Sequence, residues 1–427
     1  MLSSQSLRNT SGTQLNSSFV WALIVTLLLA LYQPFPSNFT DSTLDRAVMH
    51  VMEIFLRITY VYPGRLCPNM YCQVRLTRAV LKVLAHFLDP FPFFDSGIDV
   101  ENTQFDSIKV RIYIPRGNRS SNGAVLFLHG GGFVIGDVDL YHPLTEELAR
   151  LTQMVVVSVD YRLAPEHVFP TGLRDCERAL HYLTTKAFSK YNVDPTKIVA
   201  MGDSAGGALV AAIAQRQRNS RKRLPKLKAQ VLIYPLLQFA NMQLPSYLHY
   251  YNEMQQLAFL DPELVAFYYL MYAGVDVINH PKYAHSTLQN CHLSRLDREK
   301  LSSFLNLDDL PPLFRGNASN IFPNCDHELS TDLSSIVFNP DIAPMMRENL
   351  EGLPNSLVVT CGHDILRDEG ILYAKRLTAS NVHVTWKHFP TGFHAMLNFY
   401  ARVSTANSAL KFIADWTRQV ASSELDE

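Results

Sequence analysis

The sequence predicts an α/β fold in which a mostly parallel sheet is covered by helices on both faces. From Ser107 onward, short β-branched apolar runs alternate with segments of helical period. Continuous apolar strands of this kind are typical of parallel sheets that are buried on both faces. The expected strands are residues 108–114, 124–129, 155–161, 198–201, 231–234, 357–360 and 382–388. The expected helices are residues 144–152, 173–184, 206–216, 371–379 and 401–420.

The composition bounds the class of protein. The chain has 427 residues, of which 47% are hydrophobic and 18% charged. These values allow one large α/β domain with insertions and exclude global disorder. The formal net charge of −1 argues against nucleic acid as a partner. Its six cysteines lack zinc-site spacing, although Cys67 and Cys72 are close enough to pair in an oxidising compartment.

An apolar run at residues 19–32 raises the question of a membrane anchor. The run is short for a spanning helix, and it leaves three interpretations: a signal anchor, a cleaved signal peptide, or a buried or peripheral helix. Arg8 precedes the run, whereas Asp41 and Asp45 follow it. This asymmetry favours a cytosolic N-terminal tail at residues 1–18, a signal-anchor helix at 19–33 and a body on the far side of the membrane. Three candidate glycosylation sites lie beyond the run, at Asn38, Asn118 and Asn317.

Two regions outside the sheet are expected to cover the active site. Residues 34–95 form a helical cap segment, with helical periods at 44–62 and 74–88. This segment is an ordinary cap or, in addition, a surface in contact with a membrane. Residues 96–427 form the catalytic domain, in which an insertion at about 238–354 completes the lid. The insertion contains a helical piece at 262–272 and a loop-like run at 310–313.

Two glycine-rich runs carry the functional signal. Residues 202–207 read Gly-Asp-Ser-Ala-Gly-Gly and residues 129–132 read His-Gly-Gly-Gly, each directly after an expected strand. A Gly-x-Ser-x-Gly motif between a strand and a helix is a nucleophile elbow, which makes Ser204 the candidate nucleophile. Either run alone is weak evidence, but the two in this order indicate acyl-transfer chemistry.

The same runs supply a candidate oxyanion hole. Backbone N–H groups of Gly131, Gly132 and Ala205 are expected to face the developing negative charge. Gly130 and Asp203 are expected to support these motifs. His129 abuts the glycines and could be a base, but its position at a strand end favours a structural role.

A serine nucleophile needs an imidazole and an acid that orients it. Asp364 follows the expected strand at 357–360 and is the candidate acid, with Asp368 as the alternative. Asp368 and Glu369 fall in a first helical turn, where acidic side chains favour the helix dipole. For the base, His394 lies in the loop beyond the last strand. His388 is the alternative, while His383 and His363 have ordinary strand or loop positions.

These residues together resemble the hormone-sensitive lipase branch of the α/β hydrolases. Residues 160–166, Asp-Tyr-Arg-Leu-Ala-Pro-Glu, are typical of that branch, in which they support the oxyanion loop and the cap. The N-terminal run and residues 364–370, Asp-Ile-Leu-Arg-Asp-Glu-Gly, are similar to arylacetamide deacetylase and its relatives. The resemblance implies an α/β-hydrolase fold. It also implies a type II membrane protein of the endoplasmic reticulum whose lumenal domain hydrolyses esters, arylacetamides or neutral lipids. The sequence shows no His-Glu-x-x-His motif and no phosphate-binding loop, so neither a metal nor a cofactor is expected.

Two departures from the family pattern stand out. Val134 occupies a position where close relatives often have a cysteine, so Cys361 is expected to lack that partner. Ala395 follows the histidine in place of the usual glycine. The leading hypothesis is a serine carboxylesterase or deacetylase for lipophilic substrates. A neutral-lipid lipase and a non-catalytic, membrane-tethered binding protein are the alternatives, and the sequence does not predict an oligomeric state.

Overall fold

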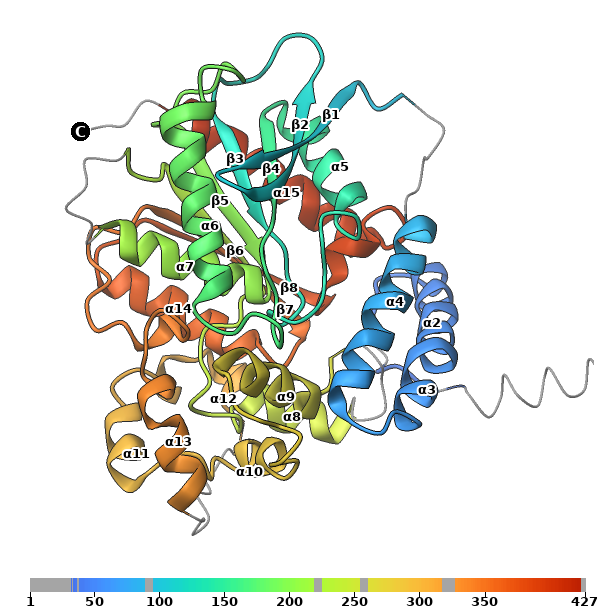
Figure 1. Cartoon of the computed structure of the whole chain (residues 1–427), viewed down its shortest axis with the longest axis vertical. Helices are drawn as coiled ribbons and strands as arrows, with labels where there is room; N and C mark the ends of the chain where they lie inside the picture. The colour runs from blue at the N-terminus through green and yellow to red at the C-terminus, as the bar shows by residue number, and fades with distance from the viewer. Residues whose placement is uncertain are drawn as a thin grey trace, which may run out of the picture.

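An eight-stranded sheet forms the centre of the computed structural model (Figure 1), which describes residues 32, 34–36, 38–88, 95–218, 225–253, 260–316 and 327–423. The strands are β1 (Ile98–Phe105), β2 (Ile108–Pro115), β3 (Ala124–Leu128), β4 (Val155–Asp160), β5 (Ile198–Asp203), β6 (Ala229–Ile233), β7 (Asn355–His363) and β8 (Val384–Phe393). Their order is β1-β2-β4-β3-β5-β6-β7-β8. The β1–β2 and β2–β4 pairs are antiparallel, and every other pair is parallel.

Helices cover both faces of the sheet, which confirms the predicted fold class. On one face α5 (His142–Thr152) and α15 (Ser404–Ser422) pack against each other, α5 against β2 and β4 and α15 against β8. On the other face lie α6 (Thr171–Tyr182), which continues into η2 (Leu183–Ala187), together with α7 (Ala205–Arg218) and α14 (Arg367–Ala379).

The burial of each strand explains which strands were predictable. Every residue of β3 and of β6 is buried, as expected for central strands with continuous apolar sequences. Strand β1 was not predicted. It lies at the edge of the sheet, where only its end residues Ile98 and Phe105 are buried, and its polar sequence Ile-Asp-Val-Glu-Asn-Thr-Gln-Phe carries no apolar run.

Two groups of helices lie beyond the sheet. The N-terminal cap comprises α2 (Thr43–Leu56), η1 (Arg57–Val61), α3 (Tyr62–Arg65) and α4 (Met70–Leu88). The side chain of Ser42 caps α2 by accepting a hydrogen bond from the Asp45 N–H. The helix expected at 44–62 is α-helical only to Leu56, and it continues as the π-helical turn η1.

The insertion forms the second group, adjacent to the first in Figure 1. It contains α8 (Pro245–Glu253), α9 (Pro262–Ala273), α10 (Tyr283–Leu288), α11 (Arg295–Leu301), η3 (Leu307–Asp309), α12 (Pro312–Arg315), α13 (His327–Val337) and η4 (Pro344–Met346). Helix α9 matches the helical piece expected at 262–272. The run at 310–313 is not wholly a loop, because α12 begins at Pro312.

Several sequence-based predictions fall on residues that the structure does not describe. The tail at 1–18, most of the anchor at 19–33 and Asn317 lie outside the described residues. Of the anchor only Tyr32 is described, and its ring centroid lies 4.8 Å from that of His50 in α2. Across the described ranges, none of the helices combines the length and apolar character needed to cross a bilayer.

Candidate active site

Ser204 lies at a sharp turn between β5 and α7. Its φ is +53°, a left-handed conformation that non-glycine residues rarely adopt. A Cβ on Gly206 would lie 1.9 Å from the carbonyl oxygen of Leu128, and a Cβ on Gly202 would lie 2.5 Å from the backbone of Gly206. Both glycines are therefore required for the helix to start this close to the sheet. The turn has the geometry of the predicted nucleophile elbow.

His394 connects the serine to a carboxylate. Its Nε2 lies 2.9 Å from Ser204 Oγ, and its Nδ1 lies 3.0 Å from Asp364 Oδ2. The other carboxylate oxygen of Asp364 accepts the Leu366 N–H at 2.9 Å. All three side chains are buried, with residues 5–7% exposed. The structure thus brings the three predicted residues into one hydrogen-bonded chain.

The alternative acid has other partners. The two carboxylate oxygens of Asp368 accept hydrogen bonds from Arg367 Nε at 2.8 Å and from the Ser246 N–H at 2.7 Å. Burial raises the pKa of Asp368, which the arginine beside it partly opposes. Because Ser246 belongs to α8, Asp368 ties the insertion to α14, whereas the carboxylate on His394 is that of Asp364. Neighbouring Glu369 accepts the Leu237 N–H at 3.0 Å.

The other histidines serve local structure. His388 forms a hydrogen bond of 3.0 Å between its Nδ1 and Thr360 Oγ1. Burial lowers the pKa of His388 to about 4. His383 is exposed at the approach to β8. His363 donates from Nε2 to the carbonyl oxygen of Asn38 at 3.0 Å, which fixes the segment before α2 against the end of β7.

The glycine triplet adopts conformations that other residues could not easily take. Gly131 has a φ of +106° and Gly132 a φ of +60°. A Cβ on Gly131 would lie 2.1 Å from the Ile135 carbonyl oxygen, and one on Gly132 would lie 2.5 Å from the ring of Tyr268. The loop closes on itself, since the Val134 N–H donates to the Gly131 carbonyl at 3.0 Å. Both glycines line the same cavity as Ser204.

Asp203, the residue before Ser204 in the elbow, holds this loop through hydrogen bonds. One of its carboxylate oxygens accepts the Gly130 N–H at 2.8 Å, and the other accepts the Tyr141 hydroxyl at 2.9 Å. Burial raises the pKa of Asp203 to about 6, although the Tyr141 and Gly130 hydrogen bonds and the nearby His394 favour its charged form. The supporting role expected of Gly130 and Asp203 thus has a specific geometry, because the Gly130 N–H donates to Asp203 and, at 3.2 Å, to the Tyr141 hydroxyl.

His129 is packed as a structural residue. Its ring is fully buried and stacks on Tyr161 at a centroid distance of 4.3 Å. Its Nδ1 lies 2.8 Å from the carbonyl oxygen of Gly130. Burial lowers the pKa of His129 to about 4, so the imidazole is neutral at physiological pH. This environment agrees with the structural role and opposes the alternative role as a base.

Residues 160–166 brace the predicted oxyanion loop, residues 130–135, and reach the cap. Tyr161 donates its hydroxyl to the carbonyl oxygen of His129 at 2.7 Å, and the Ala164 N–H donates to that of Phe133 at 2.9 Å. From α4, Arg78 donates to the carbonyl oxygens of Val134 and Ala164 at 2.9 and 2.7 Å and pairs with Glu166 at 2.8 Å. One arginine of the cap therefore contacts both the oxyanion loop and its brace.

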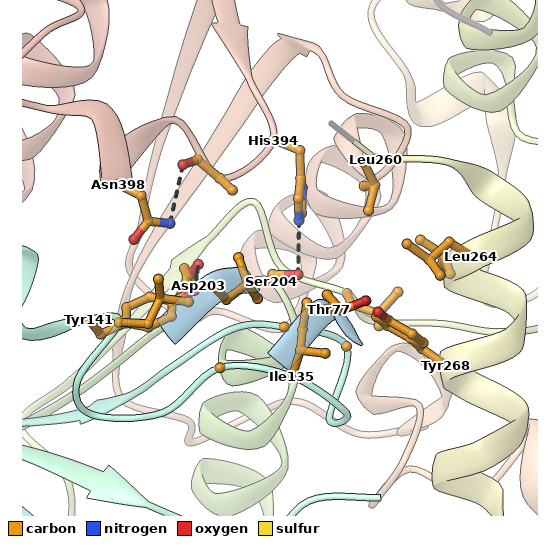
Figure 2. A pocket seen from close by; sticks show the side chains of 18 of the residues that line it. Thr77, Ile135, Tyr141, Asp203, Ser204, Leu260, Leu264, Tyr268, His394 and Asn398 are labelled. Atoms are coloured by element: carbon orange, nitrogen blue, oxygen red, sulfur yellow. Dashed lines mark hydrogen bonds between the residues drawn. The ribbon is translucent and has the colours of Figure 1, made fainter. Parts of the chain in front are cut away.

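An apolar cavity of about 210 Å³ opens above Ser204 and His394 (Figure 2). Much of its lining comes from α4, α9 and the predicted oxyanion loop, and Leu56 at the end of α2 adds to it. Helix α4 contributes Thr77, Val80, Leu81 and Leu84, the start of α9 contributes Leu264, Val265, Tyr268 and Tyr269, and the oxyanion loop contributes Gly131, Gly132 and Ile135. In Figure 2 the imidazole of His394 points at Ser204, with Tyr141 and Asp203 on one side and Leu260, Leu264 and Tyr268 on the other.

Sequence reasoning missed several residues of this site. Tyr141 follows the oxyanion loop and Arg78 lies on the cap, yet neither belongs to a recognisable motif, because each acts through contacts that only the fold creates. Tyr234 has a φ of +35°, and its ring centroid lies 5.0 Å from that of His394. No short-range sequence signal identifies these three positions.

The two departures from the family pattern have clear structural outcomes. Cys361 is a free, buried cysteine whose Sγ lies 3.9 Å from Met396 Sδ, as expected with Val134 in place of a cysteine. Ala395 adopts a φ of +62°, the left-handed region in which glycine is favoured. The sulfur atoms of Cys67 and Cys72, which the structure also has as free thiols, lie 2.7 Å apart.

Comparisons with known proteins agree with this geometry. A family model described as the alpha/beta hydrolase fold matches residues 125–301 and 327–398. Arylacetamide deacetylase of Oryctolagus cuniculus is 33% identical over 79% of this chain and 84% of its own length. Neutral cholesterol ester hydrolase 1 of Mus musculus is 32% identical over 74% of this chain and 80% of its own length.

A solved structure gives the same result. The hyperthermophilic esterase of Pyrobaculum calidifontis superposes with a TM-score of 0.60 at 26% identity, covering 82% of this chain and 94% of the esterase. Fold, motifs and relatives confirm the resemblance that the sequence suggested. The chain belongs to the α/β-hydrolase fold family and, within it, to the group that contains arylacetamide deacetylase and neutral cholesterol ester hydrolase.

Proposed function

We propose that this protein is a membrane-anchored serine hydrolase that cleaves esters or amides of lipophilic substrates through an acyl-enzyme. The observation that carries the proposal is the hydrogen-bonded chain from Ser204 through His394 to Asp364, at the base of an apolar cavity. Hydrolysis of ester or amide bonds is also the activity that the names of the relatives describe.

The first half-reaction forms the acyl-enzyme. Ser204 Oγ attacks the substrate carbonyl carbon while His394 Nε2 takes the hydroxyl proton. Asp364 holds the imidazole by its Nδ1–H and stabilises the imidazolium that results. When the tetrahedral intermediate collapses, the bond to the leaving group breaks, and the leaving alcohol or amine takes the proton from His394.

The second half-reaction restores the enzyme. A water molecule attacks the acyl carbon and gives its proton to His394 Nε2. Collapse of the second tetrahedral intermediate breaks the bond to Ser204 Oγ, which recovers the proton, and a carboxylic acid leaves. In both halves the N–H groups of Gly131, Gly132 and Ala205 stabilise the oxyanion, which is the role that the fixed backbone of this loop suits.

The lining of the cavity favours lipophilic substrates. Leucine, valine and tyrosine side chains from α4 and α9 surround the space above the serine, and apolar walls of this kind bind acyl chains or aromatic groups. A neutral-lipid lipase is the second candidate. It is favoured by the same lining and by the likeness to neutral cholesterol ester hydrolase 1. A panel of aryl acetates, arylacetamides and cholesteryl or glyceryl esters separates the two.

Covalent labelling tests the mechanism directly. We expect a fluorophosphonate probe to label the wild-type chain at Ser204 and to leave Ser204→Ala unlabelled. Turnover of an aryl acetate should fall on the order of 10⁴–10⁶-fold in Ser204→Ala, with an unchanged unfolding midpoint as the control. A wild-type chain that folds but neither reacts with the probe nor hydrolyses any ester would instead support the non-catalytic binding protein.

The proposal includes an anchor at residues 19–33 and a catalytic domain in the lumen of the endoplasmic reticulum. Asn38 and Asn118 are exposed, as glycosylation requires, and Cys291 is disulfide-bonded, as in oxidising compartments. The test is an N-terminal tag combined with endoglycosidase treatment. An anchored lumenal chain keeps its tag and loses mass on treatment, a cleaved signal loses the tag, and a tagged chain without a mass change has a cytosolic body.

A further inference from the structure

The outer side of the N-terminal cap carries an unusual concentration of exposed apolar side chains. Of the fourteen large hydrophobic residues that are exposed in the described part of the chain, seven lie between residues 32 and 83. We call five of them the cap face: Leu44, Val51, Ile58, Leu66 and Val83, which are 49–86% exposed. Leu44 and Val51 lie about two turns apart on α2 and so share one side of the helix.

The exposed charges around the cap face are mainly basic, and Asp41 is the exposed acid of the described segment 38–88. Arg65, Arg75 and Lys82 are exposed on the same helices. The acidic residues of the described segment 38–88 all have partners within the protein. Asp41 accepts the hydroxyl of Thr391 at 2.6 Å, Asp45 accepts the Ser404 N–H at 3.1 Å, and Glu53 pairs with Arg57 inside the cap. The exposed surface is thus apolar with an excess of basic over acidic side chains, which suits a membrane interface with anionic headgroups.

The cap face backs directly onto the active-site cavity. Val83 is 55% exposed, whereas its neighbour Leu84 is 5% exposed and lines the cavity. Leu56 lines the cavity two residues before Ile58 of the cap face. The same short helices thus present one side to the catalytic serine and the other to the outside, so a bilayer that touched the cap face would lie next to the cavity.

The one described residue of the apolar run at 19–32 lies against the cap. Its last residue, Tyr32, packs beside His50 of α2, and α2 is the outermost helix of the cap in Figure 1. We infer that the cap face docks on the surface of an anionic lipid bilayer and that substrate passes from the bilayer through the cap into the cavity. The inference rests on the proposed esterase function and adds a membrane surface as the partner of the cap.

A pair of ester substrates tests the docking. The full chain is reconstituted into vesicles of phosphatidylcholine with phosphatidylserine and assayed with p-nitrophenyl acetate in water and with p-nitrophenyl palmitate dissolved in the bilayer. In the double variant Val51→Asp, Ile58→Asp we expect the ratio of palmitate to acetate hydrolysis to fall about tenfold or more, because charges oppose interfacial burial. The acetate rate reports folding, and Val51→Ser, Ile58→Ser gives a milder version of the same test.

The matched control is Leu296→Asp, Leu313→Asp, at residues 75% and 85% exposed on the insertion, which should keep the wild-type ratio. Arg65→Glu with Arg75→Glu should lower the ratio in the anionic vesicles and leave it unchanged in phosphatidylcholine alone. A wild-type ratio in the Val51 and Ile58 variants overturns the docking, as does a change in oligomeric mass by light scattering, which would assign the cap face to a second copy. If the wild type cleaves neither ester, the proposed function itself fails.

Discussion

The two walls of the cavity are built in different ways. On the side of the sheet, Ser204, Gly131 and His394 are held by left-handed or tightly turned backbone and by buried hydrogen bonds. On the side of the cap, Val80, Leu81 and Leu84 contribute only apolar surface. A one-atom change in the first wall leaves a buried polar group unpaired, whereas cores tolerate exchanges among hydrophobic residues of similar volume. Under the proposed function, the fold thus separates a rigid site for bond cleavage from an adaptable site for substrate choice.

The largest effect is expected from a change in the acid of the sheet-side wall, Asp364. Asp364→Asn should keep the fold but lower kcat by about 10⁴, because an amide cannot hold and charge-stabilise the imidazole. The measurement is kcat for an aryl acetate alongside the unfolding midpoint.

Asp368→Asn is the matched control for this prediction. It leaves the Arg367 guanidinium without its carboxylate partner, so we expect a loss of about 3–5 kcal/mol of stability. Its kcat per folded molecule should stay within about tenfold of wild type. The reverse ranking of the two variants would assign the acid to Asp368.

Asp203 supports the sheet-side wall without taking part in the proposed proton transfers. Asp203→Asn removes the charged acceptor of the Gly130 N–H. Hydrogen bonds to charged groups contribute about 1.5–3 kcal/mol, so we expect kcat to fall roughly tenfold to a hundredfold through a looser oxyanion loop. An unchanged kcat would mean that the backbone turns alone position the loop.

The same variant should alter the pH dependence of stability. Because burial raises the pKa of Asp203 from 3.8 to about 6, its stabilising contribution is complete below pH 3.8 and is lost as the pH rises through about 6. The asparagine does not titrate. The free energy of unfolding of Asp203→Asn relative to wild type should therefore improve from pH 4 to pH 7, by on the order of 2–3 kcal/mol. Urea unfolding at both pH values measures it, and an equal difference at both would contradict it.

The sequence predicted the sheet-side wall far better than the cap-side wall, and the physics of each explains why. Ser204, the glycines and His394 lie at turns whose geometry is encoded within a few residues, and central strands such as β3 carry continuous apolar runs. Strand β1 lies at the sheet edge and carries no apolar run, and the contacts of Arg78 are with residues distant in sequence, so no local pattern reveals them. For the cap the sequence indicated helices, but not which of their residues face the serine.

The role of the cap-side wall is tested by changing the volume of the cavity that it lines. Leu84→Phe places a larger side chain in the cavity, so kcat/KM for a butyrate or longer acyl ester should fall relative to the acetate by about tenfold, since one methylene in an apolar pocket is worth about 1–3 kcal/mol. Val83→Phe is the matched control, because Val83 faces outward. With soluble esters in detergent it should keep the wild-type preference. Equal shifts in both variants would mean that the cap distorts as a whole.

The smallest effect is expected where the two walls meet, at Ala395. This residue follows His394, lines the cavity and has a φ of +62°. An L-residue pays roughly 1–2 kcal/mol for this conformation, and Ala395→Gly relieves that strain but adds about 0.4–1 kcal/mol of unfolded-state entropy. We expect the two terms nearly to cancel in the unfolding free energy and kcat to change less than about twofold. Ala395→Val, whose branched Cβ fits the left-handed region poorly, should lower both. A large loss of activity in the glycine variant would mean that the Ala395 methyl group contacts the substrate, which would make it part of the specificity surface as well as a turn residue.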